Sequence, residues 1–377
     1  MTGLFEPDAA ATDPTPAVPA TTPPAPDAAP TRMASEIAEI PSVVARVLRE
    51  GASETERVAR LIERRRPRFV MVAARGTSDH AGIYARYLIE TTFGWPVGLA
   101  ASSVTTVYGA RIDWRDILLL AISQSGAGPD IAAVTEAARR GGATTVALTN
   151  EPDSPIAAIA DGTLLLHAGP EVSVAATKTY VASLAAIAAL AGRLAPEAEW
   201  APALASRPDA IGSALGEGRA WLAGDGAEAV AAFARGNEAL VVSRGHNFAT
   251  ALELALKLKE TGRVFADGYS SADFLHGPVA LAGPGVPTLV PRPDGPIGAS
   301  IDEALDVASR AGMDPWIIGG DEVAGRPRAL ALTAPLPEPL TPLAFVVPGL
   351  LLVEAVARAR GRDPDAPPGL SKVTRTL

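Results

Sequence analysis

The sequence of 377 residues contains no cysteine, and this absence excludes several kinds of site at once. Without a thiol there can be no disulfide, no thiolate metal ligand and no cysteine nucleophile. Histidine is also scarce, and no two of the four histidines have the helical spacing of a zinc-binding pair. They are His80, His167, His246 and His276. The sequence therefore gives no reason to expect a zinc site.

Basic residues are missing from the start of the chain, because no Lys or Arg precedes Arg32. A secretory or transit peptide needs a basic start, whereas this segment consists mainly of Pro, Ala, Thr and acidic residues. We predict that residues 1–31 form a disordered tail. The apolar run at 343–353 is interrupted by Pro348 and is too short to span a bilayer. We therefore expect a soluble, cytoplasmic protein.

The net charge limits the classes of partner that the protein can bind, and the length indicates its number of domains. The net charge is -9 and the pI is about 5.1, which argues against a general affinity for nucleic acid or anionic membranes. Hydrophobic residues make up 48% of the chain, enough for sizeable cores. The length suggests about two domains.

The most informative stretch begins with a continuous apolar run at 117–122, typical of a strand buried on both faces of a parallel sheet. The run ends at Ser123-Gln124-Ser125-Gly126, and Pro129 then suits the first turn of a helix. Hydroxyls and free N–H groups at a helix start favour an anion, and the absence of a nucleotide-loop lysine favours a single phosphate monoester. An ordinary strand-to-helix turn rich in small residues explains this segment equally well.

The rest of the first half alternates strands with helices, which predicts right-handed crossovers and a doubly wound parallel sheet. The first helix has Ser35 as its expected cap. The expected helices cover 32–50, 54–66, 81–90, 129–140 and 173–194, and the expected strands cover 69–74, 97–100, 117–122, 144–148 and 162–166.

The second half echoes the first. Arg75-Gly76 and Arg244-Gly245 each follow an apolar run and lie 169 positions apart, and two Ser-Ser pairs follow at nearly the same offset. This indicates a duplication, so we predict an α/β protein with two tandem domains at 32–200 and 210–377, joined by a linker at 194–209. The second half has no Ser-Gln-Ser-Gly loop, so we expect one sugar pocket per chain, in the first domain.

Two further segments are rich in hydroxyls. Thr77 and Ser78 follow a strand and could enclose an anion together with the serine loop, although helix capping also explains one of them. Ser173 and Thr177 precede an Ala-rich helix. They could hold sugar hydroxyls, or Ser173 could simply cap that helix.

Three residues in the last third carry candidate chemistry. Glu260 near a helix end could be a general base, although its segment is read more easily as a solvated helix face. His276 at a turn could open a sugar ring, or could be a surface histidine. Lys372 lies between Leu370 and Val373, so its tail could pack and its amine could form a Schiff base, although a lysine near a C-terminus is usually solvated.

Taken together, these segments resemble the sugar isomerase (SIS) family, in particular the isomerase half of glutamine–fructose-6-phosphate aminotransferase. The resemblance runs from about Met33 to the end of the chain. The matching motifs are Met33-x-x-Glu36-Ile37-x-Glu39-x-Pro41, Gly76-Thr77-Ser78, Ser123-Gln124-Ser125-Gly126, Val174-Ala175-x-Thr177-Lys178, Ser243-Arg244-Gly245, Leu256-Lys257-Leu258-Lys259-Glu260, His276-Gly277-Pro278 and Lys372.

The resemblance implies a role for each matching residue. Glu260 would move a proton between carbons 1 and 2, His276 would open the ring in a neighbouring subunit's site, and Lys372 would take the open-chain ketose. It also implies a homodimer with shared active sites, a phosphorylated amino sugar as ligand, and no metal or organic cofactor. The implied substrate-binding residues are Gly76, Thr77, Ser78, Ser123, Gln124, Ser125, Val174 and Ala175.

Departures from the family pattern refine the expected activity. The chain lacks the glutaminase half and its cysteine, so we expect no glutaminase activity, and Arg75 before Gly-Thr-Ser looks like the free-standing deaminase branch. Gly128 and Ala176 replace a threonine and a serine that contact the ligand. We predict a glucosamine-6-phosphate deaminase/isomerase. The alternatives are a deglycase or isomerase acting on another phosphorylated amino sugar or sugar–amine adduct, and a non-catalytic sugar-phosphate sensor.

Overall fold

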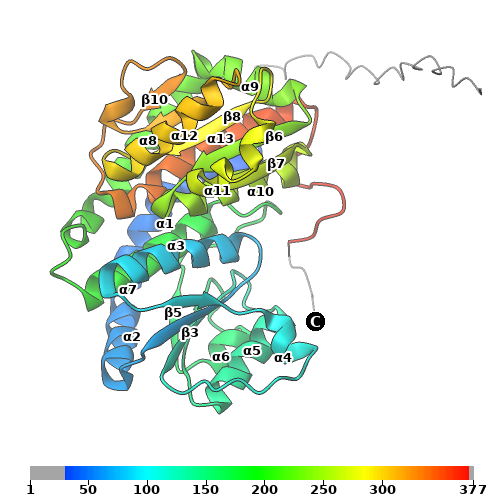
Figure 1. Ribbon diagram of the computed structural model, residues 1–377. Helices are drawn as coiled ribbons and strands as arrows, with labels where there is room; N and C mark the ends of the chain where they lie inside the picture. Colours follow the sequence, from blue (N-terminus) through cyan, green and yellow to red (C-terminus); the bar gives the residue numbers. More distant parts are fainter. Residues whose placement is uncertain (1–29, 373–377) are drawn as a thin grey trace, which may run out of the picture.

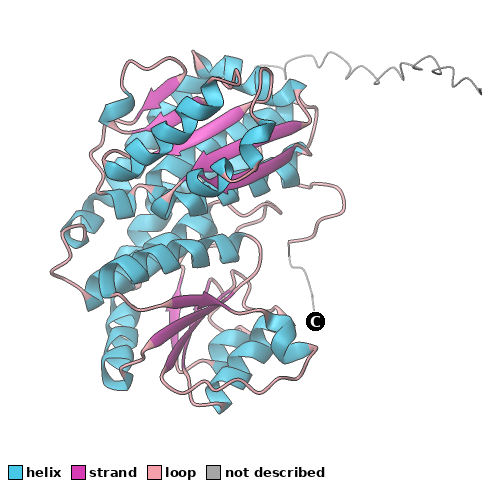
Figure 2. Ribbon diagram, in the orientation of Figure 1, coloured by secondary structure: helices cyan, strands magenta, loops and turns pink. Residues whose placement is uncertain are grey.

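The computed structural model describes residues 30–372, so the tail predicted at 1–31 lies almost entirely outside the described residues. The chain forms two five-stranded sheets in which every strand pair is parallel (Figure 2). The first sheet has the order β2-β1-β3-β4-β5 and the second the order β10-β9-β8-β6-β7. Read from β7, the second order repeats the first. The predicted α/β class with parallel sheets is confirmed, and the repeated order is consistent with the predicted duplication.

The strands are short and mostly buried. In the first sheet β3 and β4 are interior strands, and nearly every residue in them is buried, as the continuous apolar run of β3 predicts. The ten strands are β1 (Phe69–Ala73), β2 (Val97–Leu99), β3 (Ile117–Ile122), β4 (Thr144–Thr149), β5 (Gly162–Leu165), β6 (Glu238–Ser243), β7 (Phe265–Ser270), β8 (Thr288–Arg292), β9 (Trp316–Gly319) and β10 (Ala329–Ala331).

Helices between the two sheets form a core that both halves share (Figure 1). One continuous hydrophobic cluster contains residues from α1 and β1 through to α13, so neither sheet has a separate inner core. Smaller clusters lie under the outer helices of each sheet. The longer helices are α1 (Arg32–Glu50), α2 (Ala52–Arg65), α3 (Thr77–Phe93), α5 (Pro129–Arg140), α7 (Lys178–Leu194), α8 (Arg207–Ala223), α9 (Gly226–Arg235), α10 (Phe248–Gly262), α12 (Pro296–Ser309) and α13 (Pro342–Ala359). The short ones are α4 (Ser102–Thr106), α6 (Pro155–Ile159) and α11 (Ser271–Leu275).

Several predicted helix starts differ from the structure. Helix α1 has the predicted bounds, but Thr31 rather than Ser35 caps it, because the Thr31 side chain accepts a hydrogen bond from the N–H of Ala34. Helix α3 begins at Thr77, four residues earlier than predicted. Helix α7 begins at Lys178 rather than at 173, and the predicted linker at 194–209 contains a 3₁₀ helix and the start of α8.

The apolar run at 343–353 is part of a longer helix than predicted. Helix α13 continues across Pro348, and its 18 residues are long and apolar enough to cross a membrane. However, 83% of them are buried inside the protein, where α13 packs against α8, α9 and α10. Burial of this kind is that of a central core helix.

Candidate functional site

A cavity of about 410 Å³ lies beyond the carboxyl ends of β1 and β3, where open parallel sheets bind ligands. Five segments of the chain meet here: the two loops that follow β1 and β3, the start of α7, the end of α10 and the C-terminal tail. The lining residues are Arg75, Gly76, Thr77, Ser78, Ile122, Ser123, Gln124, Ser125, Gly128, Asp130, Ile131, Val174, Ala176, Thr179, Tyr180, Ser183, Lys257, Glu260, Leu370, Ser371 and Lys372.

The serine loop at 123–126 is preorganised by its own backbone. The Ser123 hydroxyl accepts a hydrogen bond from the N–H of Gly126 at 3.1 Å, and the Ser125 hydroxyl accepts one from Ala127 at 3.3 Å. Each hydroxyl therefore keeps its proton free to donate to an anion. Gly126 has a φ of 60°, and a Cβ there would lie 2.2 Å from the Ser154 Oγ, so only glycine fits this turn.

An ion pair connects the two loops that follow β1 and β3. The Arg75 Nε donates to Asp130 Oδ2 at 3.0 Å, and Asp130 is almost fully buried at the start of α5. The Arg75 side chain is 54% exposed and lines the cavity. It adds a positive charge close to the serine hydroxyls and the amino end of α5, an arrangement suited to a phosphate group.

A buried network of charges borders the cavity, and Thr77, Lys257 and Glu260 of this network line it. The Lys257 amine donates to Thr77 Oγ1 at 2.9 Å and to Glu260 Oε2 at 2.6 Å, and lies 3.4 Å from Glu253 Oε1. Glu253 also accepts from Thr77 at 3.1 Å and contacts His80 Nδ1 at 2.7 Å. The Thr77 hydroxyl proton is therefore committed to Glu253, so Thr77 joins the cavity to the network rather than offering a free donor.

Charge balance fixes the protonation of this network. Burial alone would lower the pKa of Lys257, but Glu253 and Glu260 outweigh it, so the pKa is raised above its usual value. Burial alone would raise the pKa of Glu253, but Lys257, His80 and Thr77 outweigh it, so the pKa is lowered. Lys257 is thus an ammonium and Glu253 a carboxylate near neutral pH. The Lys257 ammonium in turn holds the Glu260 carboxylate at the cavity wall.

The loop at 172–177 forms the opposite wall and differs in part from the prediction. Val174 lines the cavity as expected, but Ala175 is 1% exposed and points into the protein interior. The hydroxyls of Ser173 and Thr177 are buried, lie outside the cavity and have no hydrogen-bond partner among the described residues. They do not serve as ligands in this arrangement. Nor does Ser173 cap α7, because the N–H of Thr179 in the first turn donates to the Glu171 carboxylate instead.

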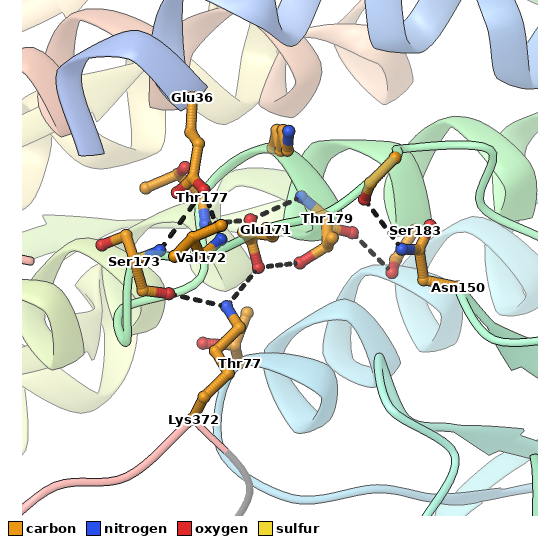
Figure 3. Close-up of polar contacts among 12 residues, drawn as sticks. Glu36, Thr77, Asn150, Glu171, Val172, Ser173, Thr177, Thr179, Ser183 and Lys372 are labelled. Atoms are coloured by element: carbon orange, nitrogen blue, oxygen red, sulfur yellow. Dashed lines mark hydrogen bonds and ion pairs between the residues drawn. The ribbon is translucent and has the colours of Figure 1, made fainter. Parts of the chain in front are cut away.

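The structure brings two of the three predicted catalytic residues to the cavity. Glu260 lines it with 23% of its side chain exposed, and Lys372 lines it with 24% exposed. Figure 3 shows the Lys372 side chain extending from the tail toward the start of α7. His276 lies elsewhere: it follows α11, is exposed and does not line the cavity of its own chain. A role for His276 therefore stays a prediction.

Sequence reasoning missed the buried partners of Glu260. The interpretation of 257–260 as a solvated helix face is wrong for Lys257, whose side chain is 1% exposed, although Lys259 is exposed. A signal was present, because Glu253, Lys257 and Glu260 are spaced i, i+4 and i+7 and therefore share one helix face. Within residues 30–372 no group of three or more His, Asp or Glu side chains is placed to hold a metal ion.

Comparison with known proteins places this geometry in a family. The SIS domain matches residues 64–193. The glutamine–fructose-6-phosphate aminotransferase (isomerizing) of Zymomonas mobilis is 35% identical over 361 residues, which is 90% of this chain but only 58% of that protein. The chain therefore spans a little over half the length of this curated relative.

Solved structures are similar over nearly the whole chain. The crystal structure of a candidate phosphosugar isomerase from Silicibacter pomeroyi is 39% identical, has a TM-score of 0.80, and covers 89% of this chain and 100% of its own. The glucosamine-6-phosphate deaminase of Thermotoga maritima is 18% identical with a TM-score of 0.68, covering 92% of this chain and 100% of its own. This second likeness is one of fold alone.

Proposed function

Because this chain belongs to the SIS family of sugar isomerases, we propose that it is a glucosamine-6-phosphate deaminase, which isomerises its substrate and releases ammonia and fructose 6-phosphate. The observation that carries the proposal is the convergence of a carboxylate, Glu260, and an amine, Lys372, on one cavity with the serine loop. A protein that only bound a sugar phosphate would need the serine loop but not the other two groups.

The phosphate of the sugar is assigned to the serine loop. Ser123 and Ser125 donate hydroxyl protons, Arg75 supplies a positive charge, and the amino end of α5 adds its dipole. With the phosphate at this end, the sugar chain extends toward α10 and the C-terminal tail. Carbons 1 and 2, where the chemistry occurs, then lie near Glu260 and Lys372.

Glu260 acts as the base in the isomerisation. It removes the proton from carbon 2 of the open-chain amino sugar and returns a proton to carbon 1, which converts the aldehyde and amine into a ketose imine. The ion pair to Lys257 fixes the orientation of the carboxylate. Lys257 thus positions the base.

Lys372 acts in the release of ammonia. Its neutral amine adds to the imine carbon, ammonia leaves as the sugar–lysine imine forms, and water then releases fructose 6-phosphate and restores the amine. Nitrogen and hydrogen balance, because one amine replaces another at carbon 2 and water supplies the ketone oxygen.

His276 is proposed to open the sugar ring in the cavity of a partner chain. It is exposed, and two apolar side chains near it in the sequence are exposed as well, Leu275 at 39% and Leu281 at 51%. An exposed polar side chain with apolar neighbours suits a surface that a second copy covers.

The proposed dimer predicts complementation between two inactive chains. Coexpressed His276→Ala and Glu260→Gln chains form mixed dimers with one intact composite site, so about a quarter of wild-type activity should return with random pairing. If His276 acts within its own chain, or does not act, the mixed protein will show no such pattern.

An ammonia-release assay over 6-phosphorylated amino sugars tests the proposal itself. We expect release from glucosamine 6-phosphate by the wild type and none by Glu260→Gln. Gly128 and Ala176 present no hydroxyl to the cavity, so the panel includes larger N-substituents and sugar–amine adducts. Release only from an adduct would favour a deglycase. Release from no compound, with sugar-phosphate binding intact, would favour a sensor.

A further inference from the structure

Glu171 is a buried carboxylate that holds the Lys372 amine. Its side chain has no exposed surface, yet it accepts four hydrogen bonds (Figure 3). Oε1 accepts from the backbone N–H groups of Thr177 at 2.9 Å and Thr179 at 3.1 Å. Oε2 accepts from the Thr179 hydroxyl at 2.7 Å and from the Lys372 amine at 2.6 Å. A buried charge is tolerated only when it is paired in this way.

The same carboxylate joins two walls of the cavity. Thr177 and Thr179 belong to the start of α7, so Glu171 satisfies N–H groups that the helix leaves unpaired. Lys372 belongs to the C-terminal tail, and its amine also donates to the carbonyl of Ser173 at 2.8 Å. The loop that carries Val174 is therefore tied to the tail through Glu171, although Glu171 itself does not line the cavity.

A second anchor holds the tail seven residues upstream of Lys372. The Asp365 carboxylate accepts hydrogen bonds from the N–H groups of Arg32 and Met33, both at 2.8 Å, and the Asp365 carbonyl accepts one from Val174 at 3.3 Å. The tail between the two anchors is exposed at 368–371. Of these two anchors, only Glu171 holds the amine itself.

We propose that Glu171 is the positioning residue for the Lys372 amine, fixing it at the cavity wall and tying it to the loop that contacts the sugar. The proposal rests on the proposed function, in which Lys372 forms the imine. Glu171 acts through Lys372 and not on the sugar. When the ammonium of Lys372 must become a nucleophile, one proton passes from Nζ to the adjacent Oε2. The freed lone pair then forms the bond to carbon 2, and the leaving ammonia completes the exchange.

Selective labelling of Lys372 tests the positioning in the absence of any sugar. Glu171→Gln removes the charge but keeps the size, and the control Glu39→Gln weakens a different ion pair at the same helix start, that of Lys178 at 2.7 Å. With a small amine-reactive reagent and peptide mass spectrometry, we expect Lys372 to react roughly tenfold faster in Glu171→Gln, because a charge-assisted hydrogen bond is lost. The control should react like the wild type. Equal Lys372 rates in Glu171→Gln and wild type would overturn the proposal.

Reductive trapping tests the consequence for chemistry. With fructose 6-phosphate and borohydride, the wild type and Glu39→Gln should form a sugar adduct on Lys372, whereas Glu171→Gln should form roughly tenfold less. Binding of inorganic phosphate should persist in all three, because the serine loop is untouched. Undiminished trapping in Glu171→Gln would overturn the proposal.

The two measurements separate failure of this inference from failure of the proposed function. If the wild type neither traps the sugar nor releases ammonia, the proposed function is wrong, while the labelling rates still decide whether Glu171 holds the amine. If Glu171→Gln does not fold, the labelling rate of Lys372 is measured in Glu171→Asp instead. This variant keeps the negative charge, but its side chain is one methylene shorter, so the carboxylate lies farther from the Lys372 amine. Faster labelling than wild type is expected, and an unchanged rate overturns the proposal.

Discussion

Replacing Lys257 by methionine would test the buried network that borders the cavity. The substitution keeps the side-chain volume but leaves the Glu253 carboxylate, which has no exposed side-chain surface, without its cation. Removing one partner of a buried ion pair typically costs about 3–5 kcal/mol. Because Glu253 retains its contacts with His80 and Thr77, we expect the lower end of that range, about 3 kcal/mol.

The loss should depend on pH in a defined direction. The folded-state pKa of Glu253 is lowered from 4.5 and that of Lys257 is raised from 10.5, so the pair stabilises the protein between these pH values. The contribution of Glu253 is lost as the pH falls through its lowered pKa. In Lys257→Met, burial is no longer opposed by the ammonium, so Glu253 takes up a proton more readily and the deficit shrinks on acidification.

Urea unfolding at pH 8 and pH 5 measures both effects. Lys257→Met should lose about 3 kcal/mol at pH 8 and less at pH 5. The double variant Glu253→Gln/Lys257→Met should regain most of that stability, because the one carboxylate of the ion-paired network that remains unpaired, Glu260, is partly exposed. Lys259→Met is a matched control at an exposed position and should stay within about 0.5 kcal/mol of the wild type. A Lys257→Met protein as stable as wild type, or a double variant no better than the single, would refute this reasoning.

Three further changes probe the cavity walls. Arg75→Ala leaves the buried Asp130 carboxylate without its cation, so it should cost about 1–3 kcal/mol of stability and raise KM for the phosphorylated sugar; chemical denaturation and kinetics measure the two effects, and an unchanged KM would contradict the role given to Arg75. Gly126→Ala, which forces a Cβ against Ser154 at positive φ, should cost about 1–3 kcal/mol and abolish phosphate binding in calorimetry. Burial raises the pKa of Glu36, so ionisation of this carboxylate opposes folding above pH 4.5. Melting curves should therefore show that the stability of Glu36→Gln relative to the wild type increases from pH 5 to pH 8. An unchanged difference in stability would contradict this reasoning.

The sequence predicted the sheets better than it predicted the helix starts. A continuous apolar run such as 117–122 is best buried as an interior strand of a parallel sheet, and its bounds match those of β3. The start of α7 was misplaced because a carboxylate outside the helix, Glu171, takes the N–H groups that a local serine was expected to cap. A contact of this kind comes from tertiary folding, and local residue patterns carry little trace of it.

The candidate site also has one part that could be predicted from the sequence and one part that could not. Glycine and serine in the loop at 123–126 are required by local turn geometry, so the loop was predictable from sequence alone. The burial of Lys257 depends on α3 packing against α10, which brings Thr77 and His80 to it. Charged residues are usually exposed, so sequence reasoning favoured the solvated face and missed the network.

The most direct test of the proposed chemistry follows the bond at carbon 2 of the sugar. Glucosamine 6-phosphate carrying deuterium at carbon 2 is incubated with the wild-type protein and with Glu260→Gln, and ammonia and the labelled position are followed together by an enzymatic assay and nuclear magnetic resonance. With the wild type, loss of deuterium from carbon 2 should accompany the release of ammonia and fructose 6-phosphate in equal amounts, and Glu260→Gln should leave the label in place. Deuterium that stays at carbon 2 in the presence of the wild-type protein, with no ammonia formed, would contradict the proposed isomerisation by Glu260.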